Sequence, residues 1–584
     1  MDVNQEVLAT LKTKIHHHLE VIYQDIATDV HLEDLSDQLM SLMRFDETFS
    51  APDPYQNNWD KRDVFAITYA NSIVKEDEAP LATLNSFLTR YFEPYINSVH
   101  ILPFFPYCSD DGFAVMDFYQ VNPDVGDWQD IHRLSKSFRL MVDLVINHGS
   151  SSGEWFKHFL AGEGEGHDYF FTAEQDANVS QVVRPRTTPL LQAVETARGK
   201  EYVWCTFSHE QIDFNFENPK VIAEFVKIIR FYLDNGAKIF RLDAVAFLWK
   251  RLGTNCLNLP ETHEVVRLLR TLIEHVAPDA VIITETNIPN GENLSYFGNA
   301  NEAHCIYNFS LPPLLLHTLV NGNCHYLKQW LMSMPPAQNG TAYFNFVASH
   351  DGIGLRPAEG LLSETEIAKL MTTMQRFGGK VSWRTTDNGI KKPYEVNIAL
   401  YDALQGTHEG PDQWQHDRFI CAHAIMLALE GIPAFYIHSL LATGNDLEKV
   451  EQTQHNRSIN RHQWDFEEIS ALLGDTTSQH ALAYQQLTTL IAIRREQSAF
   501  HPNATQFTLH MGEQIFGFWR QSRDRKQSIF CVYNISPEPH SLLLSDLNLI
   551  VTDEWRDLIG EQTYQQSDQL LKIDPYQFLW ITNT

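Results

Sequence analysis

The sequence lacks the marks of a disulfide-stabilised, metal-binding or exported protein. Its 584 residues include only 7 cysteines, an odd and scattered set with no CxxC pair or close metal-ligand spacing. Such a pattern is typical of reduced thiols in a cytosolic protein, so we expect a cytoplasmic location. The first residues, MDVNQEVLATLKTK, are charged and periodic, and they lack the apolar centre of a signal peptide.

Positive charge and long apolar runs are also scarce. Lys and Arg number 44 against 74 Asp and Glu, which gives a net charge of −30 and argues against binding to nucleic acid or anionic membranes. The longest apolar stretch, 420–437, is broken by Glu430, Gly431 and Pro433, so it predicts a core helix followed by a strand rather than a membrane span. The length and the 43% hydrophobic content indicate two or more globular domains.

The run FRLDAV, 240–245, is the most informative segment that is present. Arg241 and Asp243 are two residues apart at the end of an apolar run, so in a strand they project to the same face. The guanidinium can then hold the carboxylate ionised and oriented, as a glycosidase nucleophile requires. For an isolated RxD, an ion pair that braces a sheet is the alternative interpretation.

Three other strand-like runs end in the same manner, in an acid or a histidine followed by a break. They are LMVDLVINH (140–148), VIITETN (281–287) and FNFVASHDG (344–352). Polar side chains at strand ends before loops are typical of the catalytic face of a (β/α)₈ barrel.

The order of the elements supports an α/β fold, a (β/α)₈ TIM barrel. Helical patterns separate most of eight strand candidates, and strands that alternate with helices indicate a parallel sheet. The candidates are 64–69, 99–104, 140–146, 238–244, 280–285, 304–309, 342–348 and 432–437.

Five regions are expected along the chain. Residues 1–64 form an N-terminal helical extension, and residues 498–584 form a C-terminal antiparallel β-domain of short strands. Two interruptions, 149–217 and 352–405, are too long for ordinary loops and predict inserted domains. The catalytic barrel takes the remaining segments, which are 65–148, 218–351 and 406–497.

Taken in order, the segments DLVINH (143–148), FRLDAV (240–245), ITETN (283–287) and ASHD (348–351) resemble the four short regions of the α-amylase-type enzymes of glycoside hydrolase family 13. Finer features, found over about residues 65–500, are similar to the sucrose phosphorylase subfamily. They are HILPFFP (100–106), SDDGF (109–113), RPR (184–186), SLPPLLLH (310–317) and SINRH (458–462). The chain length and WKRLG (249–253) look more like glucosylglycerate phosphorylases than sucrose phosphorylases.

This resemblance implies a role for each catalytic residue. Asp243 is the expected nucleophile and Glu285 the acid/base, while Asp351 grips the sugar's 2- and 3-hydroxyls and Arg241 orients Asp243. The acid/base role benefits from a raised pKa.

The resemblance also implies a glucose pocket. His148 and His350 are expected to hydrogen-bond glucose, Asp110 and Arg461 to clamp the 4-hydroxyl end, and Phe113 to lie under the ring. For His350, a core histidine with its hydrogen bonds satisfied is the alternative.

The resemblance also implies residues that bind phosphate and the acceptor. Arg186 and Tyr394 match positions that bind phosphate in the family, and Phe207 and Gln211 match residues that line the acceptor subsite. The alternative for Arg186 is a surface guanidinium in a loop braced by proline.

Two departures from the sucrose enzymes suggest an anionic acceptor. The sequence has Lys392 where they carry an acidic residue that contacts fructose, and Asn287 where they carry histidine. A cationic loop suits glycerate or a sugar phosphate, although exposed lysines often only solvate a loop.

We therefore expect a retaining glycoside phosphorylase that converts 2-O-α-glucosylglycerate and inorganic phosphate to α-glucose 1-phosphate and D-glycerate. Sucrose, sucrose 6′-phosphate and glucosylglycerol are alternative substrates, and an α-glucoside hydrolase or transglucosidase is the alternative class. Asn147 occupies a position that often ligates calcium in amylases, but the resemblance to sucrose phosphorylases implies no metal and no cofactor. A homodimer is an expectation from the family alone.

Overall fold

A computed structural model describes residues 3–26, 31–385, 390–547, 554–564 and 569–584. Its centre is a closed barrel of eight parallel strands, and the predicted (β/α)₈ architecture is confirmed. The strands are β1 Phe65–Thr68, β3 Ser98–Ile101, β4 Arg139–Leu144, β9 Ala237–Leu242, β10 Val281–Thr284, β11 Cys305–Tyr307, β12 Ala342–Asn345 and β18 Ile432–Tyr436. They follow one another around the barrel in chain order, and β18 pairs with β1 to close it.

The barrel strands are buried over almost their whole length, as parallel strands covered by helices must be. The surrounding helices include α3 Pro80–Tyr91, α4 Trp128–Ser137, α6 Pro219–Asp234, α7 Pro260–Glu274, α9 Leu311–Asn321, α10 His325–Ser333, α13 Gln415–Ala428, α16 Phe466–Gly474 and α17 Gln479–Glu496.

Local sequence explains where these helices begin. Asn218 caps α6 by accepting a hydrogen bond from the Lys220 amide, and Pro219 takes the first position, where no amide hydrogen is needed. Asp127 and Asp130 form a reciprocal capping box at the start of α4.

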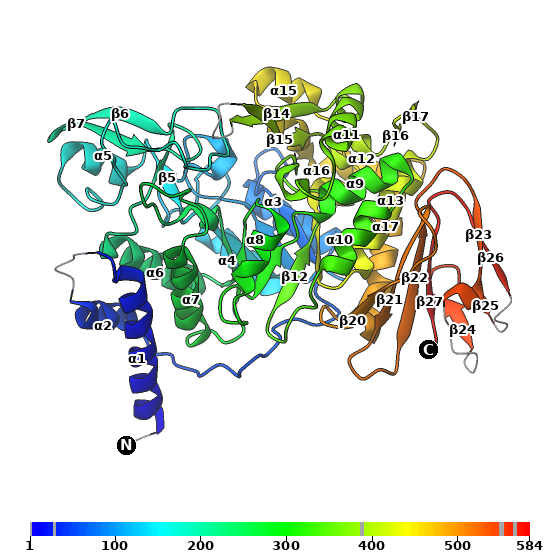
Figure 1. Cartoon of the computed structure of the whole chain (residues 1–584), viewed down its shortest axis with the longest axis horizontal. Helices are drawn as coiled ribbons and strands as arrows, with labels where there is room; N and C mark the ends of the chain where they lie inside the picture. The colour runs from blue at the N-terminus through cyan, green and yellow to red at the C-terminus, as the bar shows by residue number, and fades with distance from the viewer. Residues whose placement is uncertain (1–2, 27–30, 386–389, 548–553, 565–568) are drawn as a thin grey trace.

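Two groups of elements interrupt the barrel, and both lie over the C-terminal ends of its strands (Figure 1). Between β4 and β9 come β5 His148–Ser150, α5 Glu154–Ala161, the hairpin β6 Leu191–Thr196 and β7 Gly199–Trp204, and β8 Gln211–Asp213. Between β12 and α13 come β13 Ile353–Gly354, a short 3-10 helix Arg356–Ala358, α11 Glu364–Arg376, β14 Lys380–Thr385, β15 Lys391–Asn397 and α12 Leu400–Ala403. We retain the predicted division into five regions as a proposal.

The C-terminal part is an antiparallel β-structure, as predicted. Six strands form one sheet, in the order β20 Thr505–Thr508, β21 Ile515–Gln521, β22 Ser528–Asn534, β27 Phe578–Thr582, β24 Trp555–Asp557 and β25 Thr563–Tyr564. A second sheet pairs β23 His540–Leu543 with β26 Leu570–Ile573, and the two sheets share one hydrophobic cluster. Strands β24, β25 and β26 are short and were not predicted. In the part of the chain that the structure describes, no helix is long and apolar enough to cross a lipid bilayer.

Two N-terminal helices, α1 Val3–Tyr23 and α2 Leu32–Leu42, pack against α7 and α6 on the outside of the barrel, at the opposite end of the molecule from the C-terminal sheets (Figure 1). His18 joins α1 to α7: its Nδ1 lies 2.6 Å from Glu264 Oε1 and its Nε2 lies 3.2 Å from Thr271 Oγ1. These atoms are buried, so the contacts connect the extension to the barrel through polar groups that need partners.

We predict that His18→Ala lowers the free energy of unfolding by about 1–3 kcal/mol, because Glu264 and Thr271 each lose a buried partner. Thermal or denaturant unfolding measures the change. The matched control is His17→Ala, at a side chain that is 71% exposed, where we expect a change within about 0.5 kcal/mol. Equal effects of the two substitutions would contradict a role for His18 in holding the extension.

Candidate active site

Strand register places Asp243 beside Glu285. Leu242 at the end of β9 pairs with Thr284 at the end of β10, and each acid is the next residue along its chain. The ladder continues past the strands, because the Glu285 amide donates to the Leu242 carbonyl at 3.1 Å. Neighbouring strands lie about 4.8 Å apart, which matches the separation of about 5–5.5 Å that a retaining pair of carboxylates requires.

One guanidinium contacts both acids. Arg241 Nη1 lies 2.7 Å from Asp243 Oδ1, and Nη2 lies 3.9 Å from Glu285 Oε1. The same arginine also pairs with Asp143 on β4, whose second oxygen lies 2.6 Å from His100 Nε2. Arg241, Asp143, His100 and Asp243 are buried, so Arg241 is fixed on one side while it orients Asp243 on the other.

The two acids are distinguished by their charge partners. Burial raises the pKa of both carboxyls, Arg241 opposes the rise in each, and Asp351 adds to it at Glu285. Coupled carboxyls of this kind share a proton. The direct ion pair with Arg241 favours the ionised form of Asp243, whereas the charge of Asp351 favours the protonated form of Glu285.

The backbone after Asp243, the predicted nucleophile, is strained. Ala244 has φ 51° and ψ 28°, a left-handed conformation that non-glycine residues seldom adopt. In this conformation the Ala244 amide donates to Glu285 Oε2 at 3.0 Å. This strained backbone conformation therefore allows a hydrogen bond that helps to position Glu285.

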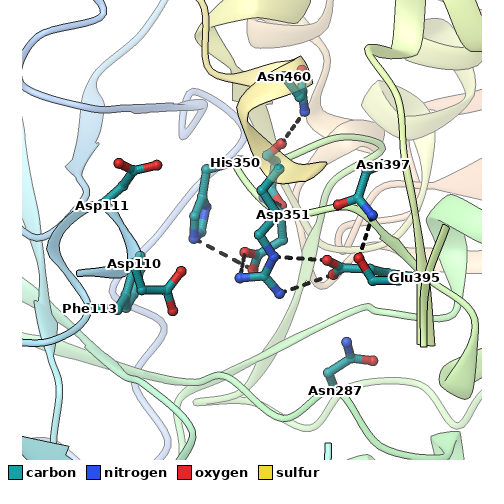
Figure 2. Close-up of polar contacts among 12 residues, drawn as sticks. Asp110, Asp111, Phe113, Asn287, His350, Asp351, Glu395, Asn397 and Asn460 are labelled. Atoms are coloured by element: carbon teal, nitrogen blue, oxygen red, sulfur yellow. Dashed lines mark hydrogen bonds and ion pairs between the residues drawn. The ribbon is translucent and has the colours of Figure 1, made fainter. Parts of the chain in front are cut away.

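The third carboxylate is held by a chain of charges (Figure 2). Asp351 Oδ1 lies 2.6 Å from Arg457 Nη1, and Arg457 in turn makes two bonds, of 2.8 and 3.1 Å, to the buried carboxylate of Glu395. Burial alone would raise the pKa of Asp351, but Arg457, His350 and Arg461 lower it well below its usual range. Sequence reasoning missed Arg457 and Glu395. The RxD rule that revealed Arg241 needs both residues on one strand, whereas this network joins three separate segments.

One cavity is lined by most of the predicted site residues, which come from the barrel and from both insertions. The lining includes Asp110, Phe113, His148, Arg186, Phe207, Gln211, Asp243, Glu285, Asn287, His350, Asp351, Arg356, Tyr394 and Arg457. We call it the active-site cavity.

The predicted glucose-binding residues lie at one end of this cavity. Phe113 stacks on His350 with ring centroids 5.2 Å apart, and His148 Nε2 lies 3.0 Å from the Phe113 carbonyl oxygen. Burial lowers the pKa of His148 and of His350, so both are neutral and can donate or accept hydrogen bonds. Gln211 Nε2, 3.3 Å from Asp110 Oδ2, connects this group to the first insertion.

The structure does not pair Asp110 with Arg461, the expected clamp. Arg461 Nη1 pairs with Asp111 at 2.5 Å and lines a neighbouring cavity of about 310 Å³, together with Asp111. Asp110 faces the active-site cavity, which Arg457 also lines and Arg461 does not. Consecutive aspartates and two arginines four residues apart give sequence reasoning no means to choose between these pairings.

Four of the predicted phosphate and acceptor residues lie close together along the cavity, whereas Gln211 contacts the glucose-binding group and Lys392 lies elsewhere. The Arg186 guanidinium lies 5.6 Å from the Phe207 ring centroid and 5.2 Å from that of Tyr394, and Asn287 Nδ2 donates to the Tyr394 hydroxyl at 3.3 Å. Lys392 does not line the cavity: its side chain is 44% exposed and its Nζ lies 3.4 Å from Glu364 Oε1.

A buried lysine anchors the first insertion to the barrel behind His148. Lys250 Nζ lies 2.8 Å from Asp213 Oδ2 and 2.9 Å from Asn147 Oδ1. Asn147, at the position that often ligates calcium in amylases, thus bonds to an ammonium group of the chain. No group of three or more His, Cys, Asp or Glu side chains suited to a metal ion occurs among the described residues.

Comparisons with known proteins found similar sequences and a similar fold. The α-amylase catalytic-domain family matches residues 94–356. A protein named glucosylglycerate phosphorylase from Spirochaeta thermophila is 41% identical over 532 residues, covering 90% of each chain. Another of that name from Escherichia coli is 38% identical over 574 residues, covering 98% of this chain and all of the relative. The crystal structure of sucrose 6F-phosphate phosphorylase from Thermoanaerobacter thermosaccharolyticum superposes with a TM-score of 0.70 at 27% identity, covering 81% of this chain and 94% of the other.

We predict that Lys250→Met lowers the free energy of unfolding by about 3–5 kcal/mol, because it leaves Asp213 as an uncompensated buried charge. The double variant Lys250→Met/Asp213→Asn should recover part of this loss, as measured by thermal unfolding. Lys238→Met is the control, since its ion pair with Asp279 is exposed and worth about 0–1 kcal/mol. A double variant no more stable than Lys250→Met would contradict the explanation.

Proposed function

The chain belongs to the α-amylase family, glycoside hydrolase family 13, and we propose that it is a retaining glycoside phosphorylase acting on 2-O-α-glucosylglycerate. It transfers glucose to inorganic phosphate and yields α-glucose 1-phosphate and D-glycerate. The observation that carries this substrate is the 38–41% identity, over at least 90% of the chain, to two proteins named glucosylglycerate phosphorylase. The composition of the cavity supports the reaction type.

The first half-reaction forms a bond to Asp243. Its carboxylate attacks the anomeric carbon while the bond from that carbon to glycerate oxygen breaks, and Glu285 gives its proton to the leaving oxygen. The product is a β-glucosyl ester on the enzyme. Asp351, held ionised by Arg457, accepts hydrogen bonds from the sugar's hydroxyls and stabilises the positive charge that develops on the ring.

The second half-reaction inverts the anomeric carbon again. A phosphate oxygen attacks, the ester bond to Asp243 breaks, and Glu285 takes back a proton from the incoming phosphate. Arg186 supports this step, since among the described residues it makes no ion pair and its one hydrogen bond is to the Pro185 carbonyl. A phosphate entering beside three carboxylates needs such a cation.

We also propose a cellular location and an oligomeric state. We place the reaction in the cytoplasm, which the seven unpaired thiols support. A homodimer rests on the family resemblance alone.

We predict that the enzyme, given α-glucose 1-phosphate and one acceptor at a time, releases phosphate fastest with D-glycerate. Glycerol, fructose and fructose 6-phosphate are the competing acceptors. Faster release with fructose or glycerol would overturn the proposed substrate. For the hydrolytic alternative, the measurement is glucose release from glucosylglycerate, which phosphate would leave unchanged.

We predict a pH effect that isolates Glu285. The fall in kcat/KM at alkaline pH reports the loss of its proton, from a carboxyl whose pKa burial raises. Glu285→Gln should lower kcat with glucosylglycerate about 10²–10⁴-fold but spare enzyme glucosylation by α-glucosyl fluoride, whose leaving group needs no proton. With the fluoride, the alkaline fall should be absent in the variant. An unchanged alkaline fall would assign it to another group.

A further inference from the structure

Arg356 is a buried cation that has no carboxylate partner among the residues that the structure describes. Its side chain is 8% exposed and lines the active-site cavity. Among the residues that the structure describes, Arg356 makes no ion pair and no side-chain hydrogen bond, and its Nε is buried without a partner. A buried guanidinium in this state is costly unless a ligand satisfies it.

Two other arginines at this end of the barrel differ, because carboxylates already neutralise them. Arg241 pairs with Asp143 and Asp243, and Arg457 pairs with Asp351 and Glu395. Only Arg186 and Arg356, among the described arginines lining the cavity, have no such pair.

The carboxylates that act electrostatically on Arg356 are engaged elsewhere. Glu359 lies 2.7 Å from Arg384 Nη2, and Glu292 accepts a 2.7 Å hydrogen bond from Asn258. Burial lowers the pKa of Arg356 and the charge of Arg384 adds to this effect. A bound anion would therefore relieve both the burial of the charge and the repulsion between the two arginines.

The position of Arg356 points to the group that leaves with the help of Glu285. The Leu355 amide donates to the Tyr394 carbonyl at 2.9 Å, which joins the short helix carrying Arg356 to β15. Gly354 allows Asn287 to approach the same segment, since a Cβ there would lie only 3.0 Å from Asn287 Nδ2. Asn287, two residues after Glu285, therefore lies against the segment of the second insertion that carries Arg356. Arg356 and Tyr394 line the same cavity as Asn287.

Asn287 has a free acceptor at this place. Its Nδ2 donates to the Tyr394 hydroxyl, while its buried Oδ1 has no hydrogen-bond partner among the described residues. A ligand that satisfies both Arg356 and Asn287 presents an anion and, close to it, a hydroxyl donor. Glycerate bonded through its 2-oxygen has a carboxylate and a 3-hydroxyl in that relation.

We propose that Arg356 binds the carboxylate of the glycerate moiety, with Asn287 Oδ1 accepting a hydrogen bond from its 3-hydroxyl. Arg356 is then the residue that selects an anionic acceptor, in place of the exposed Lys392. The proposal rests on the proposed function, since it names the group that distinguishes glycerate from glycerol in that reaction. Inorganic phosphate is the other anion that Arg356 could bind, and the experiment separates the two.

The experiment compares acceptors that differ in one charge. With α-glucose 1-phosphate as donor, phosphate release is measured with D-glycerate and with D-glyceramide, which keeps both hydroxyls but has no charge. Arg356→Gln should raise the KM for D-glycerate about 10- to 100-fold, the effect expected for a charged hydrogen-bonding partner. It should change the KM for D-glyceramide less than about threefold, and Arg356→Lys should restore part of the binding.

Two controls address folding and general charge. Arg376→Gln removes one positive charge from the same insertion, at a side chain bonded to the His408 carbonyl outside the cavity, and should leave the ratio of the two KM values unchanged. The melting temperature of Arg356→Gln should equal or exceed that of the wild type, because the substitution removes an unpaired buried charge. A variant that loses both acceptors together with its melting temperature would indicate a structural role and overturn the proposal.

The remaining outcomes distinguish the two levels of inference. No phosphate release by the wild-type enzyme with D-glycerate would overturn the proposed function and this proposal with it. Normal wild-type turnover of D-glycerate, with equal effects of Arg356→Gln on both acceptors, would overturn the role of Arg356 alone. A rise confined to the KM for phosphate in the forward reaction would assign Arg356 to phosphate instead.

Discussion

The constraint on which this site depends is the crowding of buried carboxylates at one end of the barrel. Asp143, Asp243, Glu285 and Asp351 are brought together by strand order and register, and their mutual repulsion would destabilise the fold if it were not compensated. Arg241 and Arg457 provide that compensation: Arg241 pairs with Asp143 and Asp243 and lies 3.9 Å from Glu285, and Arg457 pairs with Asp351 and Glu395. Because Arg241 is closer to Asp243 than to Glu285, the same arrangement that makes the fold tolerable also places the two acids in different electrostatic environments.

Most of the barrel, and the meeting of Asp243, Glu285 and Asp351 at one cavity, could be predicted from sequence for a physical reason. A parallel strand buried on both faces is a continuous apolar run, and a polar residue immediately after it marks the end where side chains reach the cavity. All eight predicted barrel strands are present, with ends that differ by a few residues. The identity of the family came from four such ends taken in order.

The remainder could not be predicted, because it depends on contacts between distant segments. Arg457 and Glu395 join a loop after β18 to a strand of the second insertion, and nothing in either local sequence indicates the partner. The sequence does not distinguish Asp110 from Asp111. Their backbone φ angles are 54° and 46°, and in the structure each of the two residues lines a different cavity. The unpaired guanidinium of Arg356 could not be predicted from the sequence either, because the carboxylates near it are bonded to other residues. The acceptor end of the cavity is built largely from the insertions, where loops vary at little cost to the barrel.

The ammonium of Lys250 has a consequence for how the enzyme is assembled. A joint made by a bound ion forms only when that ion is available, and it comes apart when a chelator removes it. Here the cation is the side chain of Lys250, which follows β9 in the sequence, so it is present whenever the chain folds. This contact between barrel and first insertion is therefore made by groups of the chain itself.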